Sequence, residues 1–201
     1  MRKAPLHKLP FISLSTGEKI PDSTLAYKYL ITHHLAPDLD AELTPLEKAQ
    51  SSALQHYLEN WVYFLWCWEK YVDNWRLTRD TFFPQFIPFY PVRILVCHIV
   101  YKNFQSMFYA MGITRFPREM ILEFIAEEAK TLATLIGDSG VFKGRKCGLA
   151  AMAFGMLVGI REAGEMTPIW NREVEKYPNL VRWLEEMREQ YFPERKLKES
   201  I

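Results

Sequence analysis

The stretch KLPFISLSTGEKIPDSTLAYKYL, residues 8–30, decides the fold of this 201-residue chain, because everything downstream of it predicts helices. Weak alternation over 9–13, turn chemistry over 15–18 and the short run 19–21 predict a β-hairpin. Asp22 or Ser23 is then expected to cap a helix that continues to about residue 35. Two strands are marginal alone, so either neighbouring strands are absent or another segment covers their edge.

Composition is that of an ordinary globular protein, with 49% hydrophobic residues. Its formal net charge of +1 gives no overall field that would attract nucleic acid or an anionic membrane. The three cysteines, Cys67, Cys97 and Cys147, lack metal-ligand spacing and suit a reducing, intracellular compartment. The longest uncharged apolar run, 148–160, is too short to cross a bilayer and predicts a buried helix.

After a polar linker, the chain predicts only helices. The residues Thr44-Pro45-Leu46-Glu47 predict a capping box with proline at the first helical position. A long helix follows to about residue 74, and the prolines of FFPQFIPFYP then break the chain. Periodicity predicts further helices over about 91–111, from 117, over 149–160 and over 179–190, with a loop over 137–146. The aromatic stripe at 61–75, with four tryptophans, would more commonly fill a core than line an apolar ligand pocket.

This order of elements resembles the second half of a thioredoxin-like module followed by the helical domain of a glutathione transferase. More narrowly, several segments in the same order resemble the failed-axon-connections branch of that superfamily, which is related to the metaxins: KAPLHKLPFI, GEKIPDSTLAYKYL, DLDAELTPLEKAQSSALQHYLEN, MGITRFPREMI and YPNLVRWLEEMREQYFP. The resemblance implies an α+β, mostly α fold. It implies a partial thioredoxin-like β-β-α domain over 1–36, a linker over 37–43 and an all-helical glutathione-transferase-like domain over 44–201. It also implies that the β-α-β unit which opens such a module is missing here.

The same resemblance implies a glutathione site. Leu9 and Pro10 correspond to the step that presents backbone groups to the cysteinyl unit of glutathione, and the proline of this step is expected to be cis. Asp22 and Ser23 correspond to the acidic-hydroxyl pair that holds the γ-glutamyl end at a helix N-terminus, where N–H groups and the helix dipole favour a carboxylate. The alternative interpretation of this pair is a plain helix cap.

Catalytic residues are not assigned. In relatives, the Tyr, Ser or Cys that activates the thiol lies in the unit expected to be missing, and Ser13, Ser15 and Cys67 belong to segments without that placement. The sequence Cys147-Gly148-Leu149-Ala150 also departs from the family, which has a Ser or Thr cap followed by Asp. We therefore expect two lost hydrogen bonds at the start of the buried helix.

Other candidate sites are weaker. The adjacent His33 and His34 point about 100° apart on a helix, so no metal site is predicted. Cys97 and His98 lie in the apolar stretch RILVCHIVY and predict core packing rather than a catalytic pair.

Two functions follow as expectations. The first is a non-catalytic, glutathione-transferase-like interaction module with a residual glutathione-binding edge and a protein partner. The second is a glutathione-dependent transferase that conjugates an apolar electrophile. The resemblance further implies a homodimer and a cytoplasmic location, or a mitochondrial outer-membrane association by analogy with metaxins. Neither nucleic-acid binding nor a membrane span is expected.

Overall fold

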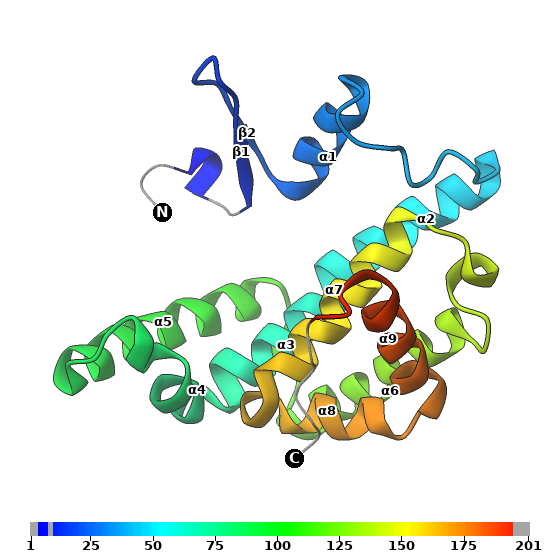
Figure 1. Ribbon diagram of the computed structural model, residues 1–201. Coiled ribbons are helices and arrows are strands. Elements are labelled where there is room, and N and C mark those ends of the chain that lie inside the picture. The colour runs from blue at the N-terminus through cyan, green and yellow to red at the C-terminus, as the bar shows by residue number, and fades with distance from the viewer. Residues whose placement is uncertain (1–3, 8–9, 195–201) are drawn as a thin grey trace. The chain divides into compact units, whose positions relative to one another are not determined.

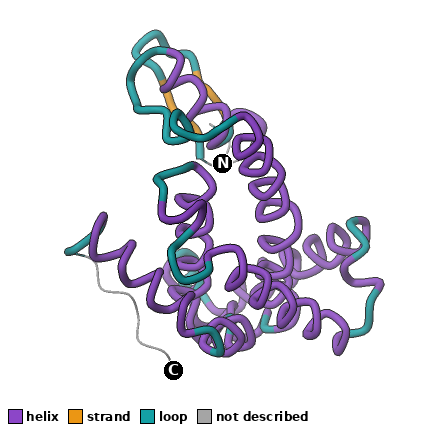
Figure 2. Tube along the Cα trace, turned by 90° about the vertical axis from the view of Figure 1, so that its right-hand side faces the viewer, coloured by secondary structure: helices purple, strands orange, loops and turns teal. Residues whose placement is uncertain are grey.

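The computed structural model describes residues 4–7 and 10–194. The chain divides into two compact units, Met1–Leu43 and Thr44–Ile201. Within the described residues, the only strands form one small sheet in the first unit, and most other residues are helical (Figures 1 and 2). The predicted fold class, α+β with mostly helices, is confirmed, and it is consistent with a partial thioredoxin-like module followed by a helical domain.

The first unit contains the predicted hairpin. Strands β1 (Phe11–Ser13) and β2 (Lys19–Pro21) pair antiparallel, with Ile12 opposite Ile20. The turn is closed by the Leu14 N–H, which donates to the Glu18 carbonyl at 2.8 Å, and Gly17 supplies the positive φ of 88° that the turn requires. A 3₁₀ turn, Pro5–His7, precedes the sheet.

Helix α1 (Ser23–Thr32) follows β2 directly. The chain after α1 returns to the same helix through Tyr27, whose hydroxyl donates to the Pro37 carbonyl at 3.3 Å and accepts the Leu39 N–H at 2.8 Å. These two bonds hold the beginning of the predicted linker, 37–43, on the first unit.

The second unit begins with the long helix that the sequence predicts. It runs through α2 (Pro45–Tyr57), a π turn (Leu58–Val62), α3 (Tyr63–Trp68) and a second π turn (Glu69–Asp73). Single π turns inside helices are locally wider than the regular α-helix and leave no signature in hydrophobic spacing. The predicted extent, to about residue 74, is confirmed, whereas the two π turns were not predicted.

The remaining helices include two that sequence periodicity missed, α4 and α8, which are only seven and eight residues long. Their order is α4 (Trp75–Thr81), a 3₁₀ turn (Phe83–Gln85), α5 (Tyr90–Ala110), α6 (Arg118–Ile136), α7 (Gly148–Ala163), α8 (Pro168–Glu175) and α9 (Pro178–Tyr191). Further 3₁₀ turns precede α6 and α7 and follow α7, at Ile113–Arg115, Val141–Gly144 and Gly164–Met166.

The core of the second unit surrounds α7. This helix packs against α2, α8 and α9, and α6 packs against α8 and α9 (Figure 1). The buried side chains on α7 include Leu149, Leu157 and Ile160, so the predicted buried helix is confirmed. Much of the aromatic stripe also packs inside the unit. At Gly159 of α7, an added Cβ would lie 3.0 Å from the ring of Trp66, so the glycine makes room for that indole.

The core prediction for Cys97 and His98 is half wrong. Cys97 is buried, but the next helical position, His98, points about 100° away from it and is exposed, with its ring edge-on to that of Trp75 of α4 at a centroid distance of 6.4 Å. Among the described residues, no helix combines the length and apolar character needed to cross a membrane.

Candidate functional site

The N-terminus of α1 is the part of the first unit where predicted site residues meet. The Asp22 carboxylate accepts the N–H of Thr24 at 2.8 Å and that of Leu25 at 3.4 Å, both through Oδ1. The Asp22 carbonyl accepts the first intrahelical bond, from Ala26, at 2.9 Å. Asp22 is therefore the N-cap of α1, which agrees with the prediction of a helix cap at Asp22 or Ser23.

The backbone at Asp22 is strained. Its φ of 68° and ψ of 142° lie in a region that residues with a side chain rarely adopt, and such conformations cost about 1–3 kcal/mol. An ordinary N-cap has an extended conformation with negative φ. The chain therefore takes a sharp, unfavourable turn between β2 and α1, and strain of this kind concentrates at functional sites.

A hydrogen bond joins this turn to the other predicted site segment. The Asp22 N–H donates to the Pro10 carbonyl at 3.1 Å, so Pro10, which precedes β1, lies beside the start of α1. Ser23 is exposed at the first position of α1, and the N–H at that position has no acceptor inside its own helix. The structure thus brings Pro10, Asp22 and Ser23 together. Leu9 and the Leu9-Pro10 peptide bond lie outside the described residues.

The charges at this helix start suit a ligand that carries both signs. The first turn of α1 contains no acidic residue, and the Ser23 N–H has no acceptor inside the helix, so this N–H and the helix dipole can favour an anionic group beside Asp22. The Asp22 carboxylate supplies one negative charge at the same place, and both of its helix bonds use Oδ1. A carboxylate bound by N–H groups and an ammonium beside Asp22 would both be accommodated here.

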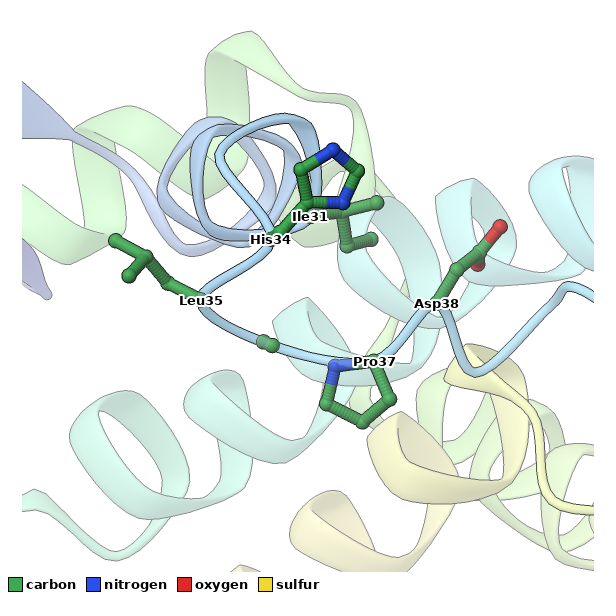
Figure 3. A pocket seen from close by; sticks show the side chains of 6 residues that line it. Ile31, His34, Leu35, Pro37 and Asp38 are labelled. Carbon is green, nitrogen blue, oxygen red and sulfur yellow. The ribbon is translucent and has the colours of Figure 1, made fainter.

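The depression that the structure shows in the first unit lies elsewhere. It has a volume of about 560 Å³ and is lined by Ile31, His34, Leu35, Ala36, Pro37 and Asp38, from the C-terminal end of α1 onward (Figure 3). Because a helix rises about 1.5 Å per residue, this depression is roughly 15 Å from the Asp22 end of α1. It therefore does not coincide with the predicted glutathione site.

The histidines beside this depression make local contacts. The ring of His33 stacks on that of Tyr29, with centroids 3.9 Å apart, and its Nδ1 lies 2.9 Å from the Tyr29 carbonyl. Among the described residues, no group of three or more His, Cys, Asp or Glu side chains is arranged to hold a metal ion.

The three cysteine side chains are all buried. Burial raises the pKa of Cys67 to about 11 and also raises that of Cys97, so both remain thiols at neutral pH. Cys147 caps α7, because its Sγ accepts the Ala150 N–H at 3.3 Å. The expected loss of both capping bonds at this helix is therefore wrong in one respect, since sulfur replaces one of them, although it is a weak acceptor.

Comparison with known proteins points to one superfamily. Residues 1–75 match the family model of the glutathione S-transferase N-terminal domain. The chain is 25% identical over 197 residues to an isoprene-epoxide glutathione S-transferase of Rhodococcus sp. (strain AD45), a match that covers 94% of this chain and 79% of the relative. Both matches support a relationship to the glutathione transferases. No solved structure matches the chain significantly.

The sequence predicted which residues form this helix start, but not the backbone conformation of Asp22 or its hydrogen bond to Pro10. The positive φ of Asp22 and its bond to Pro10 both depend on where β2 ends relative to β1. Residue type gave little signal, because the tolerance of Asp and Asn for positive φ applies mainly to the left-handed helical region, whereas the ψ of Asp22 is 142°. The sequence ends a strand with Lys-Ile-Pro and begins a helix at Ser23, which leaves Asp22 alone to make the turn.

Proposed function

We propose that this chain is a glutathione-transferase-like protein that binds glutathione at the N-terminus of α1, and that the 201-residue chain binds the tripeptide without catalysing its transfer. The observation that carries the proposal is the hydrogen bond from the Asp22 N–H to the Pro10 carbonyl. It joins the two segments that the resemblance assigns to the cysteinyl and γ-glutamyl ends of one ligand. The match of residues 1–75 to the transferase N-terminal domain supports the same ligand.

The chemistry of the γ-glutamyl group fits this helix start. The group carries an α-carboxylate and an α-ammonium on one carbon. The exposed hydroxyl and N–H of Ser23 are donors for the carboxylate, in a position that the helix dipole favours. The carboxylate of Asp22 is an acceptor for the ammonium. The Pro10 carbonyl already accepts the Asp22 N–H, so of the two residues that the resemblance assigns to the cysteinyl unit, Leu9 is the one proposed to supply the backbone groups.

The absence of catalysis is proposed from thiol chemistry. Glutathione is mostly a protonated thiol at neutral pH, and acceleration requires a donor or positive charge at its sulfur. The groups assigned at Pro10, Asp22 and Ser23 hold the ends and backbone of the tripeptide. Such contacts stabilise the bound ground state as much as the transition state and do not accelerate the chemical step.

Calorimetric titration with glutathione tests the binding half of the proposal. We expect the tripeptide to bind and the dipeptide cysteinylglycine, which lacks the γ-glutamyl group, not to bind. Ser23→Ala should weaken binding about tenfold, the worth of one hydrogen bond to a charged group. Ser15→Ala, which removes an exposed hydroxyl in the hairpin turn, is the matched control and should bind normally. Equal binding of tripeptide and dipeptide would contradict the site.

A second candidate function is a glutathione-dependent transferase that acts on an apolar electrophile. It is favoured by the relative, whose name describes an epoxide-conjugating transferase and which matches 94% of this chain. Conjugation assays with a small epoxide and with an electrophilic aromatic compound distinguish the two functions. Turnover well above background that disappears in Asp22→Ala with Ser23→Ala would establish the transferase and contradict the non-catalytic proposal.

We also propose a homodimer and a cytoplasmic protein of the failed-axon-connections and metaxin-like branch, in which the helical surface contacts a protein partner. These proposals rest on the resemblance of the sequence segments. Light scattering tests the assembly, since a monomer has a mass of 23.7 kDa. A single species of monomer mass at micromolar concentration would contradict the dimer.

A further inference from the structure

Lys70, in the second π turn of the long helix, carries a buried charge that nothing in the fold balances. Among the described residues, four charged side chains are buried, and they are Glu69, Lys70, Arg161 and Glu173. Glu69 accepts two backbone N–H groups, while Arg161 and Glu173 form ion pairs. The Lys70 ammonium makes neither an ion pair nor a hydrogen bond with another residue in the part of the chain that the structure describes. Burial of an unpaired charge is costly, so an anion beside Lys70 would be stabilising.

Three aromatic rings surround this ammonium. Its Nζ lies 4.4 Å from the ring centroid of Phe82, 5.3 Å from that of Tyr71 and 5.7 Å from that of Trp66. Ring faces attract a cation, but they are weak hydrogen-bond acceptors for its three N–H groups. Burial lowers the pKa of Lys70, which is the direction expected for an ammonium that has lost water without gaining an anion. The rings therefore orient the ammonium without replacing a counter-ion.

A second donor without an acceptor belongs to one of the same rings. The indole nitrogen of Trp66, Nε1, is buried, and no described residue accepts its N–H. Trp66 precedes Lys70 by four residues, and the contact between its ring and Nζ places both side chains on the same side of the long helix. An ammonium and an indole N–H are donors only. Both unsatisfied groups therefore require the same kind of partner, which is an acceptor.

The groups around Lys70 are fixed by the hairpin of α4 and α5, residues 75–110, which follows the π turn (Figure 1). The Tyr71 ring stacks on that of Phe104 of α5, with centroids 4.5 Å apart. The Thr78 hydroxyl of α4 donates to the Lys70 carbonyl, and the Thr78 carbonyl accepts the Phe82 N–H at 3.0 Å. The ammonium and its rings are thus held in place before any ligand arrives, which reduces the entropy that binding must cost.

We propose that Lys70 and Trp66 bind the carboxylate of a small aromatic acid, whose ring packs against Tyr71 and Phe82. One positive charge matches a monoanion better than a doubly charged phosphate. A carboxylate has two oxygens, so it can accept from the ammonium and from the indole N–H at once. Aromatic walls favour a flat ring as the rest of the ligand. This site is in the second unit, so the proposal is independent of glutathione binding at α1.

Calorimetric titration of the full chain with 2-naphthoate tests this proposal. We expect binding, and we expect 2-naphthamide, which has the same rings without the charge, to bind at least about tenfold more weakly. Lys70→Met removes the charge but keeps a side chain of similar length, and Trp66→Phe removes the indole N–H but keeps a ring. Each should weaken binding of 2-naphthoate about tenfold or more. Lys102→Met is the matched control, because Lys102 also lies over a ring, that of Tyr101 at 5.7 Å, but is exposed. It should bind normally.

Three outcomes would overturn the proposal. The first is that 2-naphthoate does not bind, or binds no better than 2-naphthamide. The second is that Lys70→Met binds 2-naphthoate as the wild type does, which would place the ligand elsewhere. The third concerns the chain without ligand, in which an unbalanced ammonium can be replaced by methionine without loss of stability. If urea denaturation shows Lys70→Met to be clearly less stable, or light scattering shows that it converts a dimer to a monomer, the ammonium already has its partner within the protein.

Discussion

The helices α1 and α2 begin in opposite ways, one in each unit. At α2, Thr44 accepts the Glu47 N–H at 3.3 Å and Glu47 accepts the Thr44 N–H at 2.9 Å, so the two residues close the helix start. Thr44 has an ordinary extended backbone, with φ of −64°. At α1, Asp22 caps alone and with positive φ. The start of α2 is closed by its own side chains without strain, whereas the start of α1 is strained and has no acidic residue in its first turn to complete a capping box.

Arg145 adds to the closure of α2 by pairing with Glu47. The hydrogen bond to Arg145, followed by the bonds with Thr44, lowers the pKa of Glu47 to about 2. The stabilising effect of this carboxylate is therefore present above its unfolded pKa and is lost as the pH falls through the folded pKa. Closure of α2 thus depends on a charge that is present throughout the neutral range.

The start of α8 is a third case, and it gives the largest expected effect. The Glu69 side chain, fully buried, accepts the N–H of Ile169 at 2.7 Å and that of Trp170 at 3.1 Å. Glu69→Ala leaves both groups without their acceptor, and we expect a loss of about 3 kcal/mol or more in the free energy of unfolding. Urea denaturation followed by tryptophan fluorescence measures it, since all six tryptophans lie in the second unit.

Glu69→Gln is the matched control, because its amide oxygen retains one acceptor in nearly the same volume. We expect it to lose clearly less than the alanine variant at neutral pH. Equal losses for the two variants would show that filling the space around residue 69 matters and capping does not. In that case Glu69 would not act as a cap, and α8 could not be compared with α1 and α2 as a capped helix start.

The pH dependence of stability sharpens the same case. Burial raises the pKa of Glu69 to about 7, and this effect outweighs the two N–H bonds and Arg118, which lower it, while Asp73 raises it further. The folded state therefore holds a proton that the unfolded state releases above its ordinary pKa of 4.5. Stability from this group is fully present below about pH 4.5 and is lost as the pH rises to about 7. Glu69→Gln should remove this pH dependence, which amounts to roughly 3 kcal/mol in the free energy of unfolding. A slope unchanged in the glutamine variant would assign it to other groups.

Strain at Asp22 is tested by substituting alanine and glycine. Both remove the cap, but glycine tolerates a φ of 68° and alanine does not. We expect the alanine variant to be less stable than the glycine variant by about 2 kcal/mol. The same pair at Thr44, which has an ordinary backbone, should differ by only about 1 kcal/mol. Hydrogen exchange of the amides in the first turns of α1 and α2 measures both differences. Equal differences would show that the turn at Asp22 stores no strain.

These helix starts show how far sequence reasoning reaches. The capping box at Thr44 and Glu47 and the cap at Asp22 or Ser23 were predicted and are confirmed, because a cap and its target are three residues apart or fewer. The cap of α8 could not be predicted, since Glu69 lies 100 residues before Ile169. Its residue type even favoured a solvated position, because charged side chains are seldom fully buried unless they are paired.

The α4–α5 hairpin shows a second limit. The apolar residues around Cys97 and His98 predicted core packing, and the helix itself is present as expected. Yet His98 and Leu95 are exposed, because an apolar pattern shows that a face avoids water and not which neighbour covers it. The prediction of the glutathione site has the same limit. Its residues and helix are recognisable in sequence, whereas the contact between Pro10 and Asp22 required the register of the hairpin.

The start of α7 gives the smallest expected effect. Cys147 occupies the N-cap and accepts the Ala150 N–H through sulfur at 3.3 Å. Because a hydroxyl oxygen is a stronger acceptor than a thiol sulfur, Cys147→Ser should raise the free energy of unfolding by about 0.5–1 kcal/mol. Cys147→Ala removes the acceptor and should lower it by a similar amount. Denaturation of the two variants beside the wild type measures both. Residue 147 is only 2% exposed, so the hydroxyl of a serine at this position would also be buried in the core. If serine destabilises as much as alanine, that burial outweighs the cap, and Cys147 serves α7 by packing as an apolar side chain.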